Sequence, residues 1–463
     1  MKLSAYTWPR PPGLTPFEHQ KTTSEFLISN KKAFCFNEQG TGKTASVIWA
    51  ADYLMHVGVI RRVLIVCPLS IMKSAWQNDL FKFAMHRKVA VAYHNDSTRR
   101  KEIVNKHMAE FVITNFEGVA IIKEQIIDGG FDLIVIDEAS AYKNVQTERW
   151  KTLRGLQAHI KGLWMLTGTP AAQSPVDAFG LARLINPTTV PKFVTHFKDQ
   201  VMVQVSQYKW KPRPEATNIV HNVLQPAIRF EKRDCIDLPP VTYVDRDAPL
   251  TPQQSKYYEK LKKDMLLQTD GEEISAVNAG AMLNKLLQIS GGAVYTDTKE
   301  VIEFDVTLRL KVVHEVVEET SNKVLVFVPF THTIELLEKY LLSKSISCSV
   351  INGSVPVSKR DEIVRDFQST GNIKVLIIQP KAASHGLTLT EADTIVWYAP
   401  CNSVETYLQA NARIDRPGQV NKMTVVHITG SPVESKVYWL LRNNINIHEK
   451  TVDLFKEVID NKI

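Results

Sequence analysis

The chain has 463 residues, of which 44% are hydrophobic and 23% are charged. This composition excludes a disordered or fibrous protein and predicts a globular one with two or three domains. The net charge of +7 is compatible with a polyanionic partner, although many enzymes that never bind nucleic acid are equally basic.

The sequence shows no clear targeting segment, and its cysteines show no pattern typical of disulfides or of a metal site. The first residues, MKLSAYTWPRPPGLTP, have no apolar core of the kind that a secretory signal needs, and no apolar run approaches the roughly 20 residues that span a bilayer. The five cysteines show no metal-ligand spacing, and Cys35 and Cys67 stand inside apolar runs. We therefore expect a protein without membrane contact in a reducing, cytoplasmic compartment, which for a virus would be the host cytoplasm.

Short runs of Val, Ile and Leu recur in both halves of the chain and predict strands buried on both faces of a parallel sheet. In the first half these runs are Lys32–Asn37, Arg62–Cys67, Glu110–Thr114, Asp132–Ile136 and Gly162–Leu166. In the second half they are Lys323–Val328, Ser347–Ile351, Lys374–Ile378, Thr394–Tyr398 and Lys422–Ile428. Stretches of helical length, such as Ser46–Val57 and Thr333–Leu342, separate them, so each half is predicted to be an α/β lobe.

Two segments near the first strand form a candidate nucleotide site. LTPFEHQ ends in Gln20, whose amide could face an adenine edge, although in isolation it would be a surface glutamine. NEQGTGKT (Asn37–Thr44) follows a strand and precedes a helix, as a phosphate-binding loop does, but it has Asn37 where the strict pattern has glycine. Its glycines let backbone N–H groups curl around phosphate, its lysine would reach the β- and γ-phosphates, and its last threonine would ligate Mg²⁺. The candidate ATP-binding residues are Gln20, Gly40, Thr41, Gly42, Lys43 and Thr44.

Two adjacent acids end the strand in FDLIVIDEAS (Phe131–Ser140). After a phosphate-binding loop, this pattern favours catalytic carboxylates over an ordinary acidic turn. Asp137 would hold the Mg²⁺ shell together with Thr44, and Glu138 would orient and deprotonate the attacking water.

The middle of the chain has few strand candidates. We place the lobe boundary near Asp237–Val244, which gives a first lobe of residues 1–240 with a helical insertion at about 171–236. The second lobe then comprises residues 241–463, with a helical insertion at about 250–300 and the C-terminal lobe proper at about 301–463. Within the first insertion, YKWKPR (Tyr208–Arg213) interleaves basic and aromatic residues, which suits nucleic-acid contact, although a charged surface loop is the default interpretation.

The segment QANARIDRPGQ (Gln409–Gln419) carries two arginines three positions apart. On a helix, Arg413 and Arg416 would share a face. Such a pair could reach a γ-phosphate and stabilise the charge that develops during phosphoryl transfer, whereas the alternative is a solvent-exposed helix face.

The ordered set of motifs resembles the Swi/Snf-type DNA translocases of helicase superfamily 2. It comprises LTPFEHQ, NEQGTGKT, VLIVCPLSIMKSAW, VITNFE, VIDEASAYKN, LTGTP, KVLVFV, GLTLTEAD and QANARIDRPGQ, over roughly residues 14–440. The resemblance implies two RecA-like parallel-sheet lobes in tandem with helical insertions, ATP and Mg²⁺ as cofactors, and DNA as partner. Trp76 after the PLS turn and Lys143–Asn144 after the acids favour this branch over the DEAD-box RNA helicases. Ser140 departs from the family, which often has histidine there, and KAASHGLTLTEAD lacks the paired glycines of the fifth motif.

The resemblance also implies roles for residues outside the ATP-binding loop. Arg413 and Arg416 would complete the catalytic site with Asp137 and Glu138. Coupling between hydrolysis and lobe movement would involve Thr167, Thr169 and Gln409. Contacts with the nucleic-acid backbone, without base reading, would come from Ser70, Thr114, Asn115, Gly386, Leu387 and Thr388.

The sequence favours an ATPase that is stimulated by duplex DNA and moves along it. A strand-separating helicase is the nearest alternative, and the absence of an evident pin-like hairpin argues mildly against it. A nucleotide-dependent switch that binds a protein, and a degenerate DNA-binding module without hydrolysis, are disfavoured by the intact motifs. No reader domain flanks the motifs, so a stand-alone microbial or viral motor fits better than a nucleosome remodeller.

Overall fold

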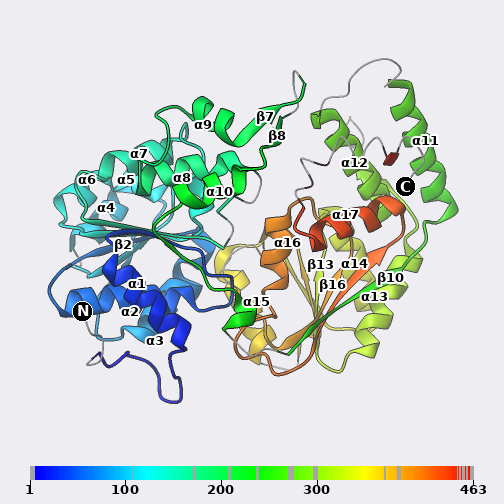
Figure 1. Ribbon diagram of the computed structural model, residues 1–463. Coiled ribbons are helices and arrows are strands. Elements are labelled where there is room, and N and C mark those ends of the chain that lie inside the picture. Colours follow the sequence, from blue (N-terminus) through cyan, green and yellow to red (C-terminus); the bar gives the residue numbers. More distant parts are fainter. Residues whose placement is uncertain are drawn as a thin grey trace. The chain divides into compact units, whose positions relative to one another are not determined.

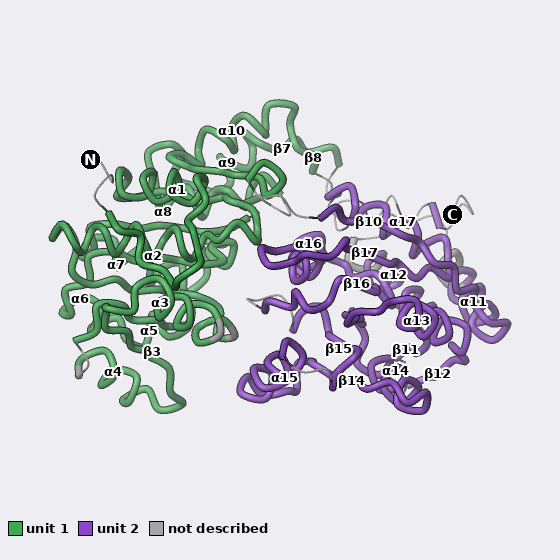
Figure 2. The backbone as a smooth tube through the Cα atoms, turned by 90° about the horizontal axis from the view of Figure 1, so that it is seen from below, with its two compact units in different colours: residues 1–237 green, residues 238–463 purple. Residues whose placement is uncertain are grey.

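The computed structural model describes most of the chain. The described residues are 6–106, 108–168, 170–171, 174–206, 210–235, 239–268, 276–295, 301–369, 372–382, 387–445, 447, 450, 454 and 457–458, with side chains except at 70, 74, 106, 264–268 and 276–278. The chain forms two compact units, Met1–Asp237 and Leu238–Ile463, coloured separately in Figure 2. Each unit is an α/β lobe built on a parallel sheet, as the sequence predicts.

The sheet of unit 1 has seven strands among the described residues, in the order β3-β4-β2-β5-β6-β1-β9, and every pairing is parallel. The strands are β1 (Lys32–Cys35), β2 (Val63–Val66), β3 (Val89–Val91), β4 (Phe111–Thr114), β5 (Leu133–Ile136), β6 (Gly162–Leu166) and β9 (Ala227–Ile228). Since all of them run the same way, the loops that follow them meet along one edge of the sheet.

Helices cover this sheet and connect its strands (Figure 1). They are α1 (Glu18–Ser29), α2 (Lys43–His56), α3 (Asn78–Phe83), α4 (Ser97–Lys106), α5 (Gly118–Ile121), α6 (Lys123–Asp128), α7 (Glu148–Leu156), α8 (Ala178–Ile185), α9 (Val194–Val201) and α10 (Ala216–Val223). The last three lie in the predicted helical insertion, which also holds an antiparallel hairpin of β7 (Met202–Gln204) and β8 (Trp210–Pro212). The sequence analysis found no such hairpin, because its strands are too short and polar to show a strand period.

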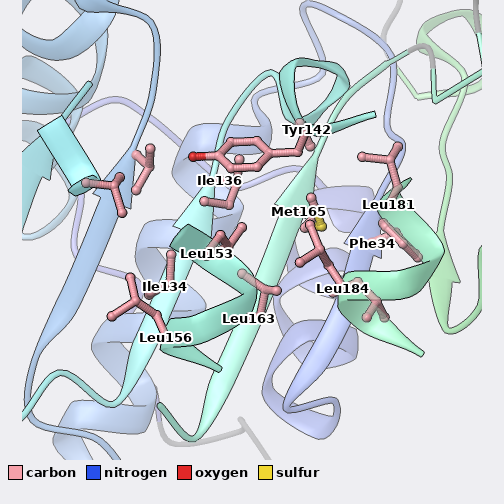
Figure 3. Packing of buried hydrophobic residues seen from close by; sticks show 14 of the residues in the cluster. Phe34, Ile134, Ile136, Tyr142, Leu153, Leu156, Leu163, Met165, Leu181 and Leu184 are labelled. Carbon is pink, nitrogen blue, oxygen red and sulfur yellow. The ribbon is translucent and has the colours of Figure 1, made fainter. Parts of the chain in front are cut away.

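Two apolar cores lie on the two faces of the sheet, and strand β5 contributes alternate residues to each. Ile134 and Ile136 pack with residues of α7 and α8, as Figure 3 shows, whereas Leu133 and Val135 pack with residues of α2. Burying a side chain of this size stabilises the folded state by about 1.5–3 kcal/mol. Because β5 buries side chains on both faces, both cores stabilise it. Cys35 and Cys67 are fully buried in the second of these cores, as the sequence predicts.

The sheet of unit 2 has six strands among the described residues, in the order β10-β17-β16-β13-β15-β14, again all parallel. The strands are β10 (Val241–Asp247), β13 (Lys323–Phe327), β14 (Cys348–Ile351), β15 (Val375–Ile378), β16 (Ala392–Trp397) and β17 (Met423–Thr429). Strand β10 comes from the segment assigned to the lobe boundary, and it pairs with β17 along its whole length.

The helices of unit 2 are α11 (Pro252–Gln268), α12 (Ala276–Gly291), α13 (Thr307–Glu319), α14 (Thr331–Ser343), α15 (Val357–Ser369), α16 (Val404–Asn411) and α17 (Pro432–Arg442). A short hairpin, β11 (Ala293–Tyr295) and β12 (Val301–Glu303), follows α12. Helix α17 begins with a complete capping box, in which Ser431 accepts from the backbone N–H of Glu434 and the Glu434 carboxylate accepts from the N–H of Ser431. The same carboxylate forms a buried ion pair with Arg309 (2.7 Å), which ties α13 to α17. Among the described residues, no helix is long and apolar enough to cross a membrane.

Candidate nucleotide and nucleic-acid site

The predicted phosphate-binding loop connects β1 to α2 in unit 1. Its turn depends on two glycines with left-handed backbones, Gly40 (φ 84°) and Gly42 (φ 76°), a conformation that costs other residues energy. Gly42 is the N-cap of α2, which begins at Lys43, so the positive end of the helix dipole lies at the loop. The Lys43 ammonium donates to the carbonyls of Asn37 (2.7 Å) and Glu38 (3.1 Å), so it is held within the loop.

Gln20 packs against this loop. Its Oε1 accepts from the backbone N–H of Phe17 (3.0 Å), and its Nε2 donates to the carbonyl of Thr41 (3.3 Å). The preceding residue, His19, contacts the same carbonyl through Nε2 (2.8 Å). The structure therefore brings Gln20 to the loop and adds His19, which the sequence analysis did not single out.

Asn37, the departure from the strict loop pattern, has a structural explanation. It is buried; its Nδ2 donates to Thr23 Oγ1 on α1 (2.8 Å), and its Oδ1 accepts from the N–H of Phe230 (3.0 Å). The neighbouring Glu38 accepts from the N–H of Lys232 through Oε2 (3.0 Å). These hydrogen bonds anchor the loop to α1 and to the segment after β9. A glycine at position 37 has no side chain and could not form the bonds that Asn37 makes.

Replacing Gly42 with alanine should weaken ATP binding about tenfold, equal to ~1.4 kcal/mol. A Cβ at this position would lie 2.1 Å from Gln20 Nε2, so the Gln20 side chain would have to leave Thr41. Gly58→Ala is the matched control, because Gly58 has a similar backbone (φ 74°) just beyond the other end of α2, with no atom near its Cβ. Both variants should lose about 1–2 kcal/mol of stability from the left-handed backbone, measured by denaturant unfolding. Equal ATP affinity in the two variants, measured with a fluorescent ATP analogue, would show that the contact with Gln20 does not shape the site.

The two predicted carboxylates lie at the end of β5. Asp137 accepts from two donors: its Oδ2 from the indole N–H of Trp76 (2.9 Å) and its Oδ1 from the backbone N–H of Glu138 (2.9 Å). Burial raises the pKa of Asp137, while the Trp76 hydrogen bond and the Lys43 ammonium act to lower it. Lys43 and Asp137 thus interact electrostatically, which links the phosphate-binding loop to the acids.

Glu138 has a left-handed backbone (φ 51°, ψ 53°) at the point where the chain turns from β5 into the 3₁₀ turn η4 (Ala139–Tyr142). Such a conformation costs a non-glycine residue of order 1–3 kcal/mol, and residues that adopt it cluster at functional sites. The backbone here therefore supports the view that this carboxylate is held in a required direction.

Three further predicted residues of unit 1 lie at the same edge of the sheet. Thr114 is the last residue of β4, Asn115 follows it, and Thr167 follows β6; all three are buried. Asn115 Oδ1 accepts from Arg100 (3.4 Å), and the N–H of Thr167 donates to the carbonyl of Cys35 (3.1 Å) beside the phosphate-binding loop. The structure places the backbone of Ser70 in the turn η2 (Leu69–Ile71) after β2, whereas its side chain and all of Thr169 lie outside the described residues.

The expectation that Arg413 and Arg416 share a helix face is wrong. Helix α16 ends at Asn411, and both arginines lie in the turn that follows. The helix ends there because Trp397 Nε1 binds Asn411 Oδ1 (2.9 Å) and the N–H of Leu389 binds the carbonyl of Arg413 (3.1 Å), which draws the chain back toward β16.

The turn nevertheless brings both arginines to the predicted nucleic-acid segment of unit 2. Arg413 is buried and donates to the carbonyl of Leu387 (3.1 Å), and Arg416 donates through NH1 to Thr388 Oγ1 (3.2 Å). Gln409, on α16, is also buried and donates to Glu405 (3.2 Å). Gly386 lies outside the described residues.

Comparison with known families identifies the chain. The family model described as SNF2-related domain matches residues 19–291, and that of the helicase conserved C-terminal domain matches residues 308–418. The chain belongs to the SNF2-related family.

Its relatives in this family are distant and longer. The chain is 26% identical over 439 residues to the protein named ATP-dependent DNA helicase DDM1 of Arabidopsis thaliana, covering 87% of this chain and 56% of that protein. It is 25% identical to the uncharacterized ATP-dependent helicase MG018 of Mycoplasma genitalium, covering 91% of this chain and 41% of that protein. A solved structure titled Sulfolobus solfataricus SWI2/SNF2 ATPase core in complex with dsDNA is 20% identical, with a TM-score of 0.46 and coverage of 97% of this chain and 96% of that one. The chain spans about half the length of the curated relatives that it matches.

The residues of this SNF2-related chain fit Mg²⁺ bound together with a nucleotide. Among the described residues, no group of three or more His, Cys, Asp and Glu side chains could hold a metal ion by itself. Mg²⁺, however, is commonly bound through one or two carboxylates together with substrate phosphates. The Asp137 carboxylate is a ligand of this kind, the Thr44 hydroxyl at the start of α2 could add a second oxygen, and the left-handed backbones of Gly40 and Gly42 shape the loop as a phosphate-binding turn.

Proposed function

We propose that this chain hydrolyses ATP and uses the reaction to move along DNA, with duplex DNA as its track. One observation carries the proposal: the phosphate-binding loop after β1 and the two acids after β5 lie at the same edge of the parallel sheet of unit 1. Since the proposed substrate is DNA inside a cell, we also propose the cytoplasm as its place of action.

In the proposed mechanism, unit 1 binds the nucleotide. The loop N–H groups and the N-terminus of α2 accept the phosphates, Lys43 neutralises their charge, and Gln20 orients the adenine. Thr44 and Asp137 would hold Mg²⁺, which when bound would supply positive charge against the charge that develops on the phosphates. Glu138 would accept a proton from the water that attacks the γ-phosphate. Its left-handed backbone would fix the direction of the carboxylate.

Unit 2 would contribute positive charge to the same reaction. We propose that Arg416 and the buried Arg413 act on the γ-phosphate only while ATP is being hydrolysed. Their contacts with Leu387 and Thr388 support a coupled role, because a change at the nucleic-acid segment would move the arginines as well. Thr167 and Thr169 of unit 1 and Gln409 of unit 2 would transmit the same change.

ATP hydrolysis should rise at least several-fold when duplex DNA is added, with little dependence on DNA sequence. The residues proposed to contact DNA, Ser70, Thr114, Asn115 and Gly386–Thr388, suit backbone contacts that carry no sequence information. The stimulation should fall steeply with salt, because counterions compete for the phosphates. ATP turnover should be measured without nucleic acid and with single-stranded DNA, duplex DNA and RNA, and equal turnover in all four conditions would contradict the proposal.

Strand separation is a second candidate function because of the β7–β8 hairpin. Lys198 Nζ of α9 lies 3.7 Å from the centre of the Trp210 ring of β8, and Val203 in β7 and the nearby Val205 are exposed. Bases at a strand junction could stack on an aromatic ring carried by such a hairpin. A displacement assay on a forked duplex, compared with displacement of a triplex-forming strand from intact duplex, would separate unwinding from translocation.

A further inference from the structure

The buried indole of Trp76 forms a direct hydrogen bond to a proposed metal ligand. Trp76 is fully buried in the core between the unit 1 sheet and α2, and its Nε1 donates to Asp137 Oδ2 (2.9 Å). The two residues are 61 positions apart in the sequence and lie on segments that follow the adjacent strands β2 and β5. The indole N–H is a donor only, so Asp137 Oδ2 is the acceptor in this bond.

The hydrogen bond fixes the direction of the carboxylate. With Trp76 on Oδ2 and the Glu138 N–H on Oδ1, each oxygen has one partner, and the plane of the Asp137 carboxylate is defined. A carboxylate has about four acceptor positions, so two remain for the metal ion or for water bound to it. Outer contacts of this kind orient metal ligands in many proteins, and removing them typically reduces metal affinity or activity by 10–100-fold.

Trp76 also belongs to the segment that carries a proposed nucleic-acid contact. The turn η2, which contains Ser70, continues without a break into the π-helical turn η3 (Met72–Gln77), which contains Trp76. Helical turns of this wide type are rare and occur frequently at functional sites. A displacement of the backbone at Ser70 would therefore be transmitted to the indole of Trp76 through a short helical segment.

We propose that Trp76 is a positioning residue that holds Asp137 in the direction needed for Mg²⁺ and ties that direction to the nucleic-acid segment at Ser70. The inference rests on the proposed function, since it takes Asp137 as the metal ligand. It adds that an apolar core residue, in contact with neither substrate, sets the affinity of the site for its metal.

The test compares Trp76→Phe with Trp164→Phe. Trp164 is equally buried in the same core, and its Nε1 also donates one 2.9 Å hydrogen bond, to the carbonyl of Asn30. Both substitutions remove one indole N–H and similar volume, so both should lower the melting temperature by similar amounts. The apparent Mg²⁺ affinity is read from MgCl₂ titrations of the binding of mant-ADP, a fluorescent ADP that needs no hydrolysis. Trp76→Phe should weaken it by about 10–100-fold, and Trp164→Phe should leave it unchanged.

A second measurement needs neither metal nor a Trp76 variant. The chain has eight tryptophans, so ¹⁵N-tryptophan labelling gives eight indole N–H resonances. Asp137→Ala should shift one of them strongly and speed its exchange with deuterium, whereas Glu138→Gln should leave that resonance in place, because the Glu138 side chain does not bind the indole.

The outcomes separate this inference from the proposed function. Equal Mg²⁺ affinity in Trp76→Phe and wild type, or no moved indole resonance in Asp137→Ala, would overturn the role of Trp76 alone. If mant-ADP binding to the wild-type chain were independent of Mg²⁺, the metal site itself would be wrong. If DNA did not stimulate ATP hydrolysis while Trp76→Phe still weakened the apparent Mg²⁺ affinity, the motor function would be rejected. Trp76 would then remain a positioning residue for Mg²⁺.

Discussion

Arg416→Ala should slow ATP hydrolysis by about 10³–10⁵-fold and leave ATP affinity nearly unchanged. This loss corresponds to roughly 4–7 kcal/mol at about 1.36 kcal/mol per decade. The nucleotide would be held by the loop of unit 1, while Arg416 belongs to unit 2, so its contact would form mainly in the transition state. Arg416→Lys should not restore the rate, because a point charge lacks the planar fork of a guanidinium.

Single-turnover hydrolysis and nucleotide affinity should be measured side by side, with melting curves to exclude unfolding. Arg246→Ala is a suitable control, since Arg246 also lies in unit 2 and forms ion pairs with Glu315 and Glu319 of α13, a helix that carries none of the predicted site residues. The control should hydrolyse ATP at the wild-type rate. A folded Arg416→Ala protein within about threefold of wild type, well short of the expected effect, would remove Arg416 from the catalytic site.

Glu138→Gln should bind ATP and DNA but hydrolyse ATP about 10²–10⁴-fold more slowly. Glutamine keeps the shape of the side chain and meets the same left-handed backbone, but it cannot accept the proton of the attacking water. Because Asp137 is unchanged, metal-dependent nucleotide binding should persist.

Steady-state turnover and nucleotide binding in Glu138→Gln test this expectation. Glu124→Gln, at an exposed position of the same unit, controls for the loss of one negative charge and should have no effect. Near-normal turnover in Glu138→Gln would mean that another group activates the water.

The sequence predicted the sheets well because their strands are buried on both faces. All ten predicted strands are present, and the residues of runs such as Leu133–Ile136 pack alternately into a core on each face of the sheet. The strands that were missed lack this signal. Strand β9 has only two residues, and β10 has no fully buried residue, so its segment was assigned to the lobe boundary.

The candidate site was predictable where its chemistry is carried by neighbouring residues. The phosphate-binding loop and the two acids are continuous motifs, so their spacing is visible in the sequence. The contacts of Trp76 with Asp137 and of Asn37 with Thr23 join segments that are distant along the chain, and they depend on which strands are neighbours and how the helices pack. The end of α16 before Arg413 depends likewise on the bond from Trp397 to Asn411, which helical periodicity cannot reveal.

Strand β10 leaves the ribosome long before the strand that it pairs with. It starts at Val241, whereas β17 starts at Met423, and synthesis at 5–20 residues per second separates the two by on the order of 10–40 s. Until then, the backbone N–H and C=O groups that will bind β17 are open to strands of other chains. The strand ends in Asp245, Arg246 and Asp247, and charged side chains of this kind discourage such pairing. The charges of β10 therefore act against pairing with strands of other chains during the interval before unit 2 can close its sheet.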